Sequence, residues 1–158
     1  MDVEKARRRF EELRAHDGVL PVQAVAEVYD ALEPVHYDNI FGRWKGADIE
    51  TGHFMARDAR AARWYGKIFN SRWDARPLVC YDEDGNLYAN TPLIGGAGAS
   101  LWMVEFRGVV SAALVYDALP MVDHFRKVGD RTLMGVTDGR PELVLDNGEH
   151  SYFWLERD

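Results

Sequence analysis

The sequence predicts an α+β protein in which two N-terminal helices and a helical insertion accompany an antiparallel β-barrel of about eight strands. Three observations support this prediction. Apolar residues recur at helical spacing early in the chain, whereas short alternating runs separated by turn residues fill the rest. Apolar residues make up 47% of the 158 residues, enough to bury a core within one domain. The aromatic share of 12% supplies walls for a cavity as well as filling for a core.

Two helices are expected at the start of the chain. The first has Asp2 as its N-cap and Gly18 as its stop, and the second begins at Pro21 and ends before Pro34. Because acids are interleaved with the basic run 7–9, this run is interpreted as a solvated helix face rather than a nucleic-acid-binding arm. The apolar stripes of the two helices are Val3, Ala6, Phe10 and Leu13, and Val25, Val28, Tyr29 and Leu32.

A third helix is predicted over 58–69, behind an Asp58 cap, and strands dominate the rest of the chain. Asn147-Gly148 is a strong hairpin signal because both turn residues tolerate positive φ. Eight strands can close into a barrel that holds one small ligand. The expected strands are 49–55, 78–81, 87–90, 101–107, 109–116, 131–137, 142–146 and 150–156.

Charge and cysteine content exclude several classes of protein. Lys and Arg number 19 against 26 Asp and Glu, a net charge of −7 that disfavours a nucleic-acid partner. Cys80 is the only cysteine, so no internal disulfide can form and no oxidising compartment is needed. The N-terminus lacks the apolar stretch of a secretory signal, and no run is long enough for a membrane span. A cytoplasmic location is therefore expected.

The most individual stretch is Gly42-Arg43-Trp44-Lys45-Gly46. In a small barrel, a tryptophan between two glycines lets the backbone pass closely under the indole. Trp44 can then plug the closed end of the barrel while its N–H reaches a carbonyl. The alternative is that Trp44 contacts a ligand.

Further motifs surround this stretch, and together they carry a family resemblance. They are His36-Tyr37-Asp38-Asn39, Trp64-Tyr65-Gly66-Lys67, Tyr116-Asp117-Ala118-Leu119-Pro120, Asp123-His124-Phe125-Arg126-Lys127-Val128 and Tyr152-Phe153-Trp154-Leu155-Glu156-Arg157. From about residue 24 to the C-terminus, the chain resembles the bacterial family in which a GXWXG domain is fused to a short domain of unknown function.

The resemblance implies a lipocalin-like or fatty-acid-binding-like barrel with an apolar ligand, and it implies no reaction. The length of the chain predicts a single domain, 1–158. We expect it to consist of an N-terminal helix (1–20), a GXWXG module (21–76) and a C-terminal module (77–158) that completes the barrel. A similar signature occurs in nitrobindin-type haem barrels, but Ala47-Asp48 replaces the further glycine of that pattern. The main rival fold is the cone of the nuclear-transport-factor and ketosteroid-isomerase type, which the many short hairpins after residue 76 disfavour.

Several polar residues are candidates for the chemistry. A partly buried Lys67 needs an acid such as Asp38 or Asp123 to remain charged. Within four residues, Asp123 offers an acid, His124 a titratable base, and Arg126 a guanidinium group that can bind a carboxylate through two hydrogen bonds. If this segment is a strand, Asp123 points to one side and His124 and Arg126 to the other; if it is a helical turn, Asp123 and Arg126 can form a salt bridge.

A dedicated metal site or cofactor is not expected. Cys80 has no second thiol nearby and is interpreted as a packing residue. The histidines lack the HxH and HExxH spacings of metal ligands. They are His16, His36, His53, His124 and His150.

The preferred function is non-covalent binding of a fatty acid or another lipid-like molecule, with Arg126 or Lys67 meeting its polar head. The alternative is an enzyme that isomerises or cyclises an apolar substrate, with Asp123 or His124 as the base and Tyr116 or Tyr65 as the hydrogen-bond donor. A third interpretation is a homodimer whose interface covers the apolar surface. The expected ligand-binding residues are Trp44, Tyr65, Lys67, Tyr116, Arg126 and Trp154.

Overall fold

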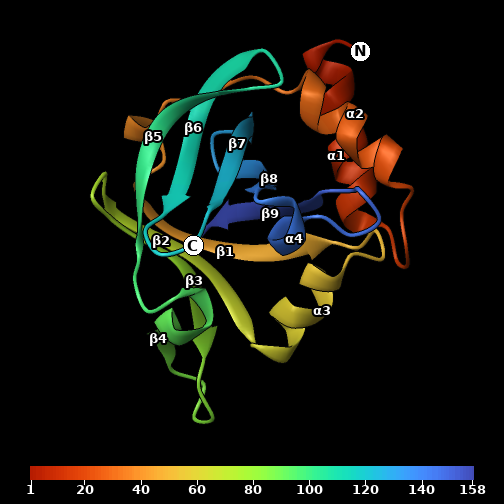
Figure 1. The fold of residues 1–158 in the computed structure, drawn as a ribbon. Helices are drawn as coiled ribbons and strands as arrows, with labels where there is room; N and C mark the ends of the chain where they lie inside the picture. The colour runs from red at the N-terminus through yellow and green to blue at the C-terminus, as the bar shows by residue number, and fades with distance from the viewer.

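Nine antiparallel strands form one sheet in the computed structural model, which describes residues 1–158 (Figure 1). The strands are β1 (Gly42–Ile49), β2 (Trp64–Ser71), β3 (Asp74–Tyr81), β4 (Leu87–Ala89), β5 (Ala99–Phe106), β6 (Val109–Tyr116), β7 (Met121–Gly129), β8 (Thr132–Gly139) and β9 (Ser151–Arg157). Neighbours in the sheet follow the order β2, β1, β9, β8, β7, β6, β5, β3 and β4.

The sheet closes because β2 also pairs with β3. One end of β3 meets β5 at the Ala75–Ala99 bridge, and its other end pairs with β4. Eight strands therefore form a ring, and β4 lies beside it. This ring confirms the barrel-like α+β fold expected from the sequence rather than the rival cone.

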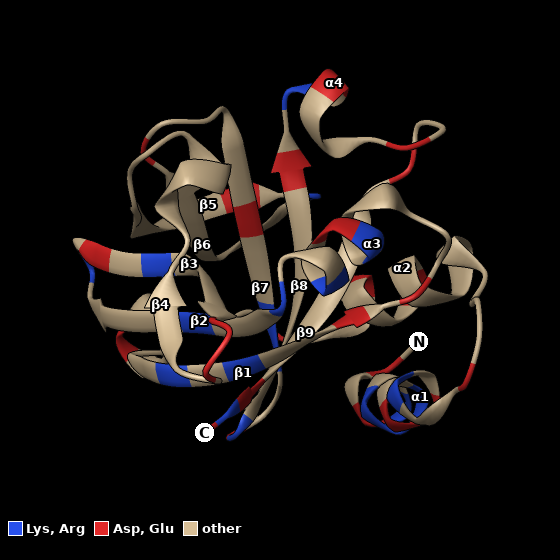
Figure 2. Ribbon diagram, turned by 90° about the horizontal axis from the view of Figure 1, so that it is seen from below, with Lys and Arg blue, Asp and Glu red and all other residues tan.

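Helices α1 (Val3–Ala15) and α2 (Val22–Ala31) lie together on the outside of the ring (Figure 1). Asp2 caps α1 by accepting a hydrogen bond from the backbone N–H of Lys5 at 2.8 Å, as expected. Lys, Arg, Asp and Glu are interleaved around α1 (Figure 2), and Arg7 pairs with Glu4 on this helix. Both helices thus agree with the sequence prediction, and the basic run 7–9 lies on a charged helix surface.

The predicted helix 58–69 is wrong beyond Ala61. The helix α3 (Phe54–Ala61) begins earlier, and Trp64 opens the strand β2 instead. The register between β2 and β3 shifts on both sides of Gly66, so Trp64 and Lys67 both face the inside of the ring although they stand three residues apart. The apolar residues that suggested a helix, Ala61, Trp64, Tyr65 and Ile68, instead lie on two elements, because Ala61 ends α3 and the other three belong to β2. Consecutive residues of β2 are buried, so this strand lacks the alternation of a half-exposed strand.

Other boundaries also differ from the prediction. Residues 49–55 do not form a strand, because β1 ends at Ile49 and α3 starts at Phe54. Segment 142–146 is not a strand either, since it overlaps the short helix α4 (Pro141–Val144). The Asn147-Gly148 turn is confirmed, with φ values of 51° and 77°.

The sequence allows a strand or a helical turn for residues 123–126, and in the structure they belong to the strand β7. It is covered on both faces, by the interior of the ring and by the N-terminal helices. Phe125 belongs to the core inside the ring, whereas Val128 packs in a second core with Phe10 and Val25 of α1 and α2. A strand buried on both sides loses the apolar-polar alternation on which sequence prediction depends.

Candidate functional site

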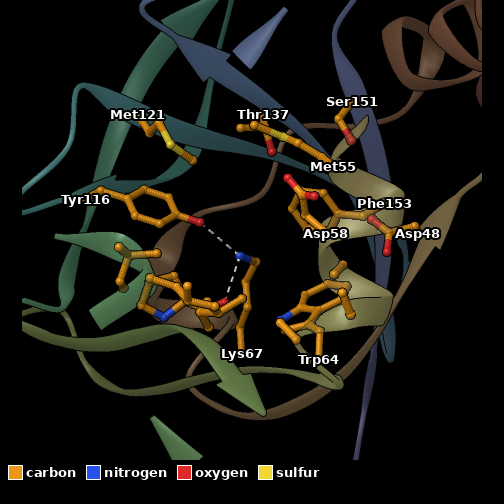
Figure 3. Close-up of a pocket in the computed structure, with 17 residues that line it drawn as sticks. Asp48, Met55, Asp58, Trp64, Lys67, Tyr116, Met121, Thr137, Ser151 and Phe153 are labelled. Atoms are coloured by element: carbon orange, nitrogen blue, oxygen red, sulfur yellow. Dashed lines mark hydrogen bonds between the residues drawn. The ribbon is translucent and has the colours of Figure 1, made fainter. Parts of the chain in front are cut away.

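A cavity of about 490 Å³ opens at one end of the ring (Figure 3). Its walls come from α3, from the short helix η2 (Thr91–Ile94), and from inward-facing side chains of the strands. Most of the lining is apolar or aromatic and includes Trp64, Tyr116 and Phe153. Met121, at the start of β7, lines the cavity, so the cavity lies at that end of the strand.

Lys67 reaches into this cavity from β2 and forms a buried ion pair with Asp123 of β7. The Nζ atom donates hydrogen bonds to Asp123 Oδ2 at 2.8 Å, to the carbonyl of Pro77 at 3.1 Å and to the hydroxyl of Tyr116 at 3.5 Å. The two charged side chains are 4% and 1% exposed. The protein therefore supplies an acceptor for each of the three ammonium protons. Asp123 is one of the two acids that the sequence proposed as partners of Lys67.

The carboxylate of Asp123 is satisfied by two further donors. The Tyr116 hydroxyl donates to Oδ2 at 3.0 Å, and the Thr137 hydroxyl donates to Oδ1 at 2.9 Å. Burial raises the pKa of Tyr116 well above its usual value, and the adjacent negative charge of Asp123 raises it further. Tyr116 therefore stays protonated and keeps its bond to Asp123.

Aromatic rings surround the Lys67 ammonium. Its Nζ lies 5.0 Å from the ring centre of Phe153, 5.5 Å from that of Trp64 and 5.8 Å from that of Tyr116, within the range of cation–π attraction. Trp64 can occupy this place because residue 46 is glycine: a Cβ there would stand 2.4 Å from the indole ring. The second glycine of the motif thus shapes the cavity wall.

Asp48 is a cavity residue that the sequence analysis did not select. It lies on β1 opposite Phe153 of β9, and its carboxyl group makes no hydrogen bond or ion pair within the chain. Burial raises its pKa to about 6, although the charges of Arg60 and Lys67 act in the other direction. Its position two residues after Gly46 was the available signal, because alternate residues of a strand share a face.

Replacing Asp48 by Asn is expected to stabilise the protein above pH 7. The folded-state pKa of about 6 exceeds the ordinary 3.8, so the parent loses stability as the pH rises through this interval and stays less stable above it. The shift corresponds to about 2–3 kcal/mol at pH 8. Urea denaturation of parent and variant between pH 4 and pH 8 measures the difference, which should shrink steadily toward pH 4. Equal stability at pH 8 would contradict this account of Asp48.

Four of the expected ligand-binding residues do not line the cavity. The Tyr65 hydroxyl donates to the carboxylate of Asp158 at the C-terminus. Trp154 lies under Arg14 of α1, with the guanidinium carbon 5.3 Å from its ring centre. The other two residues are Trp44 and Arg126.

Trp44 is 1% exposed, and its indole N–H donates to the Ile40 carbonyl at 2.8 Å, the contact expected for a buried plug. It adjoins a surface depression that includes Gly129, at the opposite end of β7 from the cavity. These contacts agree with the packing interpretation of Trp44, which does not line the cavity beside Lys67.

Arg126 is buried outside the ring rather than in the cavity. Its guanidinium donates to the Leu32 carbonyl at 3.0 Å and lies 5.0 Å from the ring centre of Tyr29 on α2. Asp123 and Arg126 form no salt bridge, because their side chains leave β7 on opposite faces. Arg126 anchors the helical layer and cannot meet a ligand in this cavity.

Asp123 and His124 also point to opposite faces of β7. His124 stacks on Phe106 at 4.1 Å between ring centres, and its Nε2 lies 3.2 Å from an Asp138 oxygen. Burial lowers the pKa of His124, and Asp138 partly offsets this effect. Since His124 lies outside the ring and Asp123 lies behind the lining residues, these two residues do not form an acid–base pair in the cavity.

The cavity residues do not fit a haem group. No histidine or cysteine is among the lining residues, and these supply the commonest axial ligands. Tyr116 could ligate iron only after giving up its hydrogen bond to Asp123. No group of three or more His, Cys, Asp and Glu side chains is arranged to hold a metal ion.

Fold and site together define the class of this chain: a barrel-like antiparallel sheet with helices on its outside and an apolar cavity at one end. Residues 27–85 match the family described as "GXWXG protein", and residues 97–157 match "Domain of unknown function (DUF4334)". The chain belongs to the family in which these two regions follow one another. This agrees with the resemblance noted from the sequence.

A solved structure supports the assignment over the whole chain. It is described as the crystal structure of a protein from Thermomonospora curvata, with 34% sequence identity and a TM-score of 0.87. The alignment covers 98% of this chain and 99% of that one. No curated protein matches the chain.

None of the four helices is both long and apolar enough to cross a membrane.

Proposed function

We propose that the protein binds an apolar, lipid-like small molecule non-covalently in the cavity beside Lys67. The observation that carries this proposal is the cavity itself, because about 490 Å³ of space with mostly apolar walls matches the usual size and character of a small-molecule site. Trp64, Phe153 and Met55 offer the broad contact surfaces that such a ligand needs. We place this activity in the cytoplasm, as the single cysteine suggests.

The polar head of the ligand is better proposed as a group without negative charge than as the carboxylate of a fatty acid. Each proton of Lys67 already has an acceptor in the protein, and Arg126 lies outside the ring. An entering carboxylate would also face Asp48 and, at the rim, the exposed Asp58. Like charges in a poorly hydrated site repel strongly, so an anionic head is disfavoured.

Binding of decan-1-ol, compared with decanoate, tests this function. At pH 8 we expect the alcohol to bind in a one-to-one complex, at least about tenfold more tightly than the anion, a difference of about 1.4 kcal/mol. Isothermal titration calorimetry gives both affinities, and native mass spectrometry of the purified protein reports any ligand that is retained.

Ala59→Trp supplies the blocked variant, because Ala59 lines the cavity from α3. Arg57→Trp is its matched control, since Arg57 is exposed on the same helix and does not line the cavity. We expect Ala59→Trp to abolish binding and Arg57→Trp to leave it unchanged. Absence of binding of both decyl compounds to the parent protein would overturn the proposed function.

A further inference from the structure

The polar groups of the cavity leave an excess of negative charge. Lys67 is the only basic side chain in the lining, and Asp123 already neutralises it. Asp48 and Asp58 then remain without a compensating cation inside the cavity. The charge of Arg60 on α3 acts on Asp48 from outside the cavity, but Arg60 pairs with Glu50 at 3.0 Å and is 62% exposed.

Of the two uncompensated carboxyl groups, Asp48 is half-buried in the cavity wall and Asp58 is exposed at the rim. Asp48 shares its end of the cavity with Trp64 and Phe153 (Figure 3), and Phe153 is its direct partner across β1 and β9. An unpaired carboxylate among aromatic walls is costly to bury, and a ligand that supplies a hydrogen-bonded cation removes that cost.

We propose, on the basis of the binding function above, that the natural ligand is an apolar amine whose ammonium group pairs with Asp48. The ammonium hydrogen-bonds to the free carboxylate oxygens, and the hydrocarbon part lies against Met55, Leu78 and Ile94. Lys67 and Asp123 act differently from Asp48: their mutual bonds hold β2 to β7 and keep the cavity wall in place.

This assignment makes amine binding dependent on pH. Burial raises the pKa of Asp48 to about 6, so its carboxyl group is ionised at pH 8 and largely protonated at pH 5. Within the cavity, Asp48 shares the lining with the charged residues Lys67 and Asp58. Outside it, the acidic, basic and histidine residues of the two surface depressions that Asp48 also borders are Arg14, His16, Asp17, Glu50, Arg60 and Arg63. A primary alkylamine is charged at both pH values. Its affinity should therefore fall about tenfold from pH 8 to pH 5, following the ionised fraction of Asp48.

The test compares decylamine with decan-1-ol by calorimetry on the parent protein and on Asp48→Asn. At pH 8 we expect the parent to prefer the amine by at least about tenfold. Asp48→Asn should remove this preference by weakening the amine, and it should leave the alcohol within about threefold of the parent value. The variant is nearly isosteric, so the cavity keeps its shape.

Asp58→Asn is the matched control, because Asp58 lines the same cavity but is exposed to solvent, which screens its charge. It should keep the preference for the amine. If the parent binds alcohol and amine equally, or if Asp58→Asn rather than Asp48→Asn removes the preference, the assignment to Asp48 is wrong while the proposed function stands. If the parent binds neither compound, the proposed function itself fails.

Discussion

Replacing Lys67 by methionine is expected to lower the free energy of unfolding by about 3–5 kcal/mol, the usual cost of removing one partner of a buried ion pair. Methionine keeps much of the side-chain volume but leaves the Asp123 carboxylate, 1% exposed, without its cation. Tyr116 and Thr137 still donate to that carboxylate, but neither carries a charge. Urea denaturation at pH 7 followed by circular dichroism measures the loss.

The double variant Lys67→Met/Asp123→Asn separates the contribution of the ion pair to the free energy of unfolding from the contribution of side-chain packing. Asparagine removes the unpaired charge and keeps an oxygen that can accept from Tyr116 or Thr137, so we expect the double variant to regain at least half of the lost stability. Lys127→Met is the matched control, because Lys127 pairs with Asp130, which is 93% exposed. That surface pair should contribute less than about 1 kcal/mol. A Lys67→Met variant no less stable than Lys127→Met would refute the role given to the buried pair.

The partnership of Lys67 with Asp123 could be anticipated from the sequence, because a buried ammonium needs a nearby acid. The sequence could not choose between Asp38 and Asp123, since this choice depends on which strands face each other across the ring. In the structure, Asp38 is 69% exposed beside His36, whereas Asp123 faces Lys67 across the interior. The need of a buried ammonium for an acid can be recognised from Lys67 alone, but the acid that meets this need lies 56 positions further along the chain.

The elements that were predicted correctly either have one solvent-exposed and one buried face or contain a turn that requires positive φ values. The apolar stripes of α1 and α2 and the Asn147-Gly148 turn are of this kind. Prediction failed where the local pattern was ambiguous. Burial of consecutive residues in β2, and of β7 on both sides, removes the alternation that identifies a strand. Arg126 was assigned to the ligand because its side of β7 could not be determined from the sequence.

Asp48 was missed for a related reason. From the sequence alone, an aspartate two residues beyond the GXWXG motif is interpreted as an ordinary surface residue. This interpretation changes once β1 is known to continue to Ile49. Only then does strand alternation place Trp44, Gly46 and Asp48 on one face. The strand β1 thus connects the motif with the cavity. Trp44 packs at the end of the ring away from the cavity, Gly46 makes room for Trp64, and Asp48 lines the cavity at the other end of the ring.

Because Trp44 and the cavity lie at opposite ends of the ring, we expect Trp44→Ala to destabilise the fold without weakening ligand binding. The Trp44 indole is 1% exposed, donates to the Ile40 carbonyl, and has the Arg157 guanidinium 4.4 Å from its ring centre. Truncation removes a large apolar surface and leaves a void in the core, at a cost of about 3–5 kcal/mol. Thermal and urea denaturation should both show the loss.

Two further variants make the Trp44 prediction specific. Trp44→Phe keeps most of the ring but leaves the Ile40 carbonyl without its donor, and it should cost only about 1–2 kcal/mol. Trp73→Ala removes a tryptophan that is 64% exposed, and its effect should stay within about 1 kcal/mol. Because Trp44 lies at the end of the ring away from the cavity, the affinity of folded Trp44→Ala for decan-1-ol should remain within about threefold of the parent. A variant that melts like the parent but no longer binds the alcohol would instead place Trp44 in the ligand site.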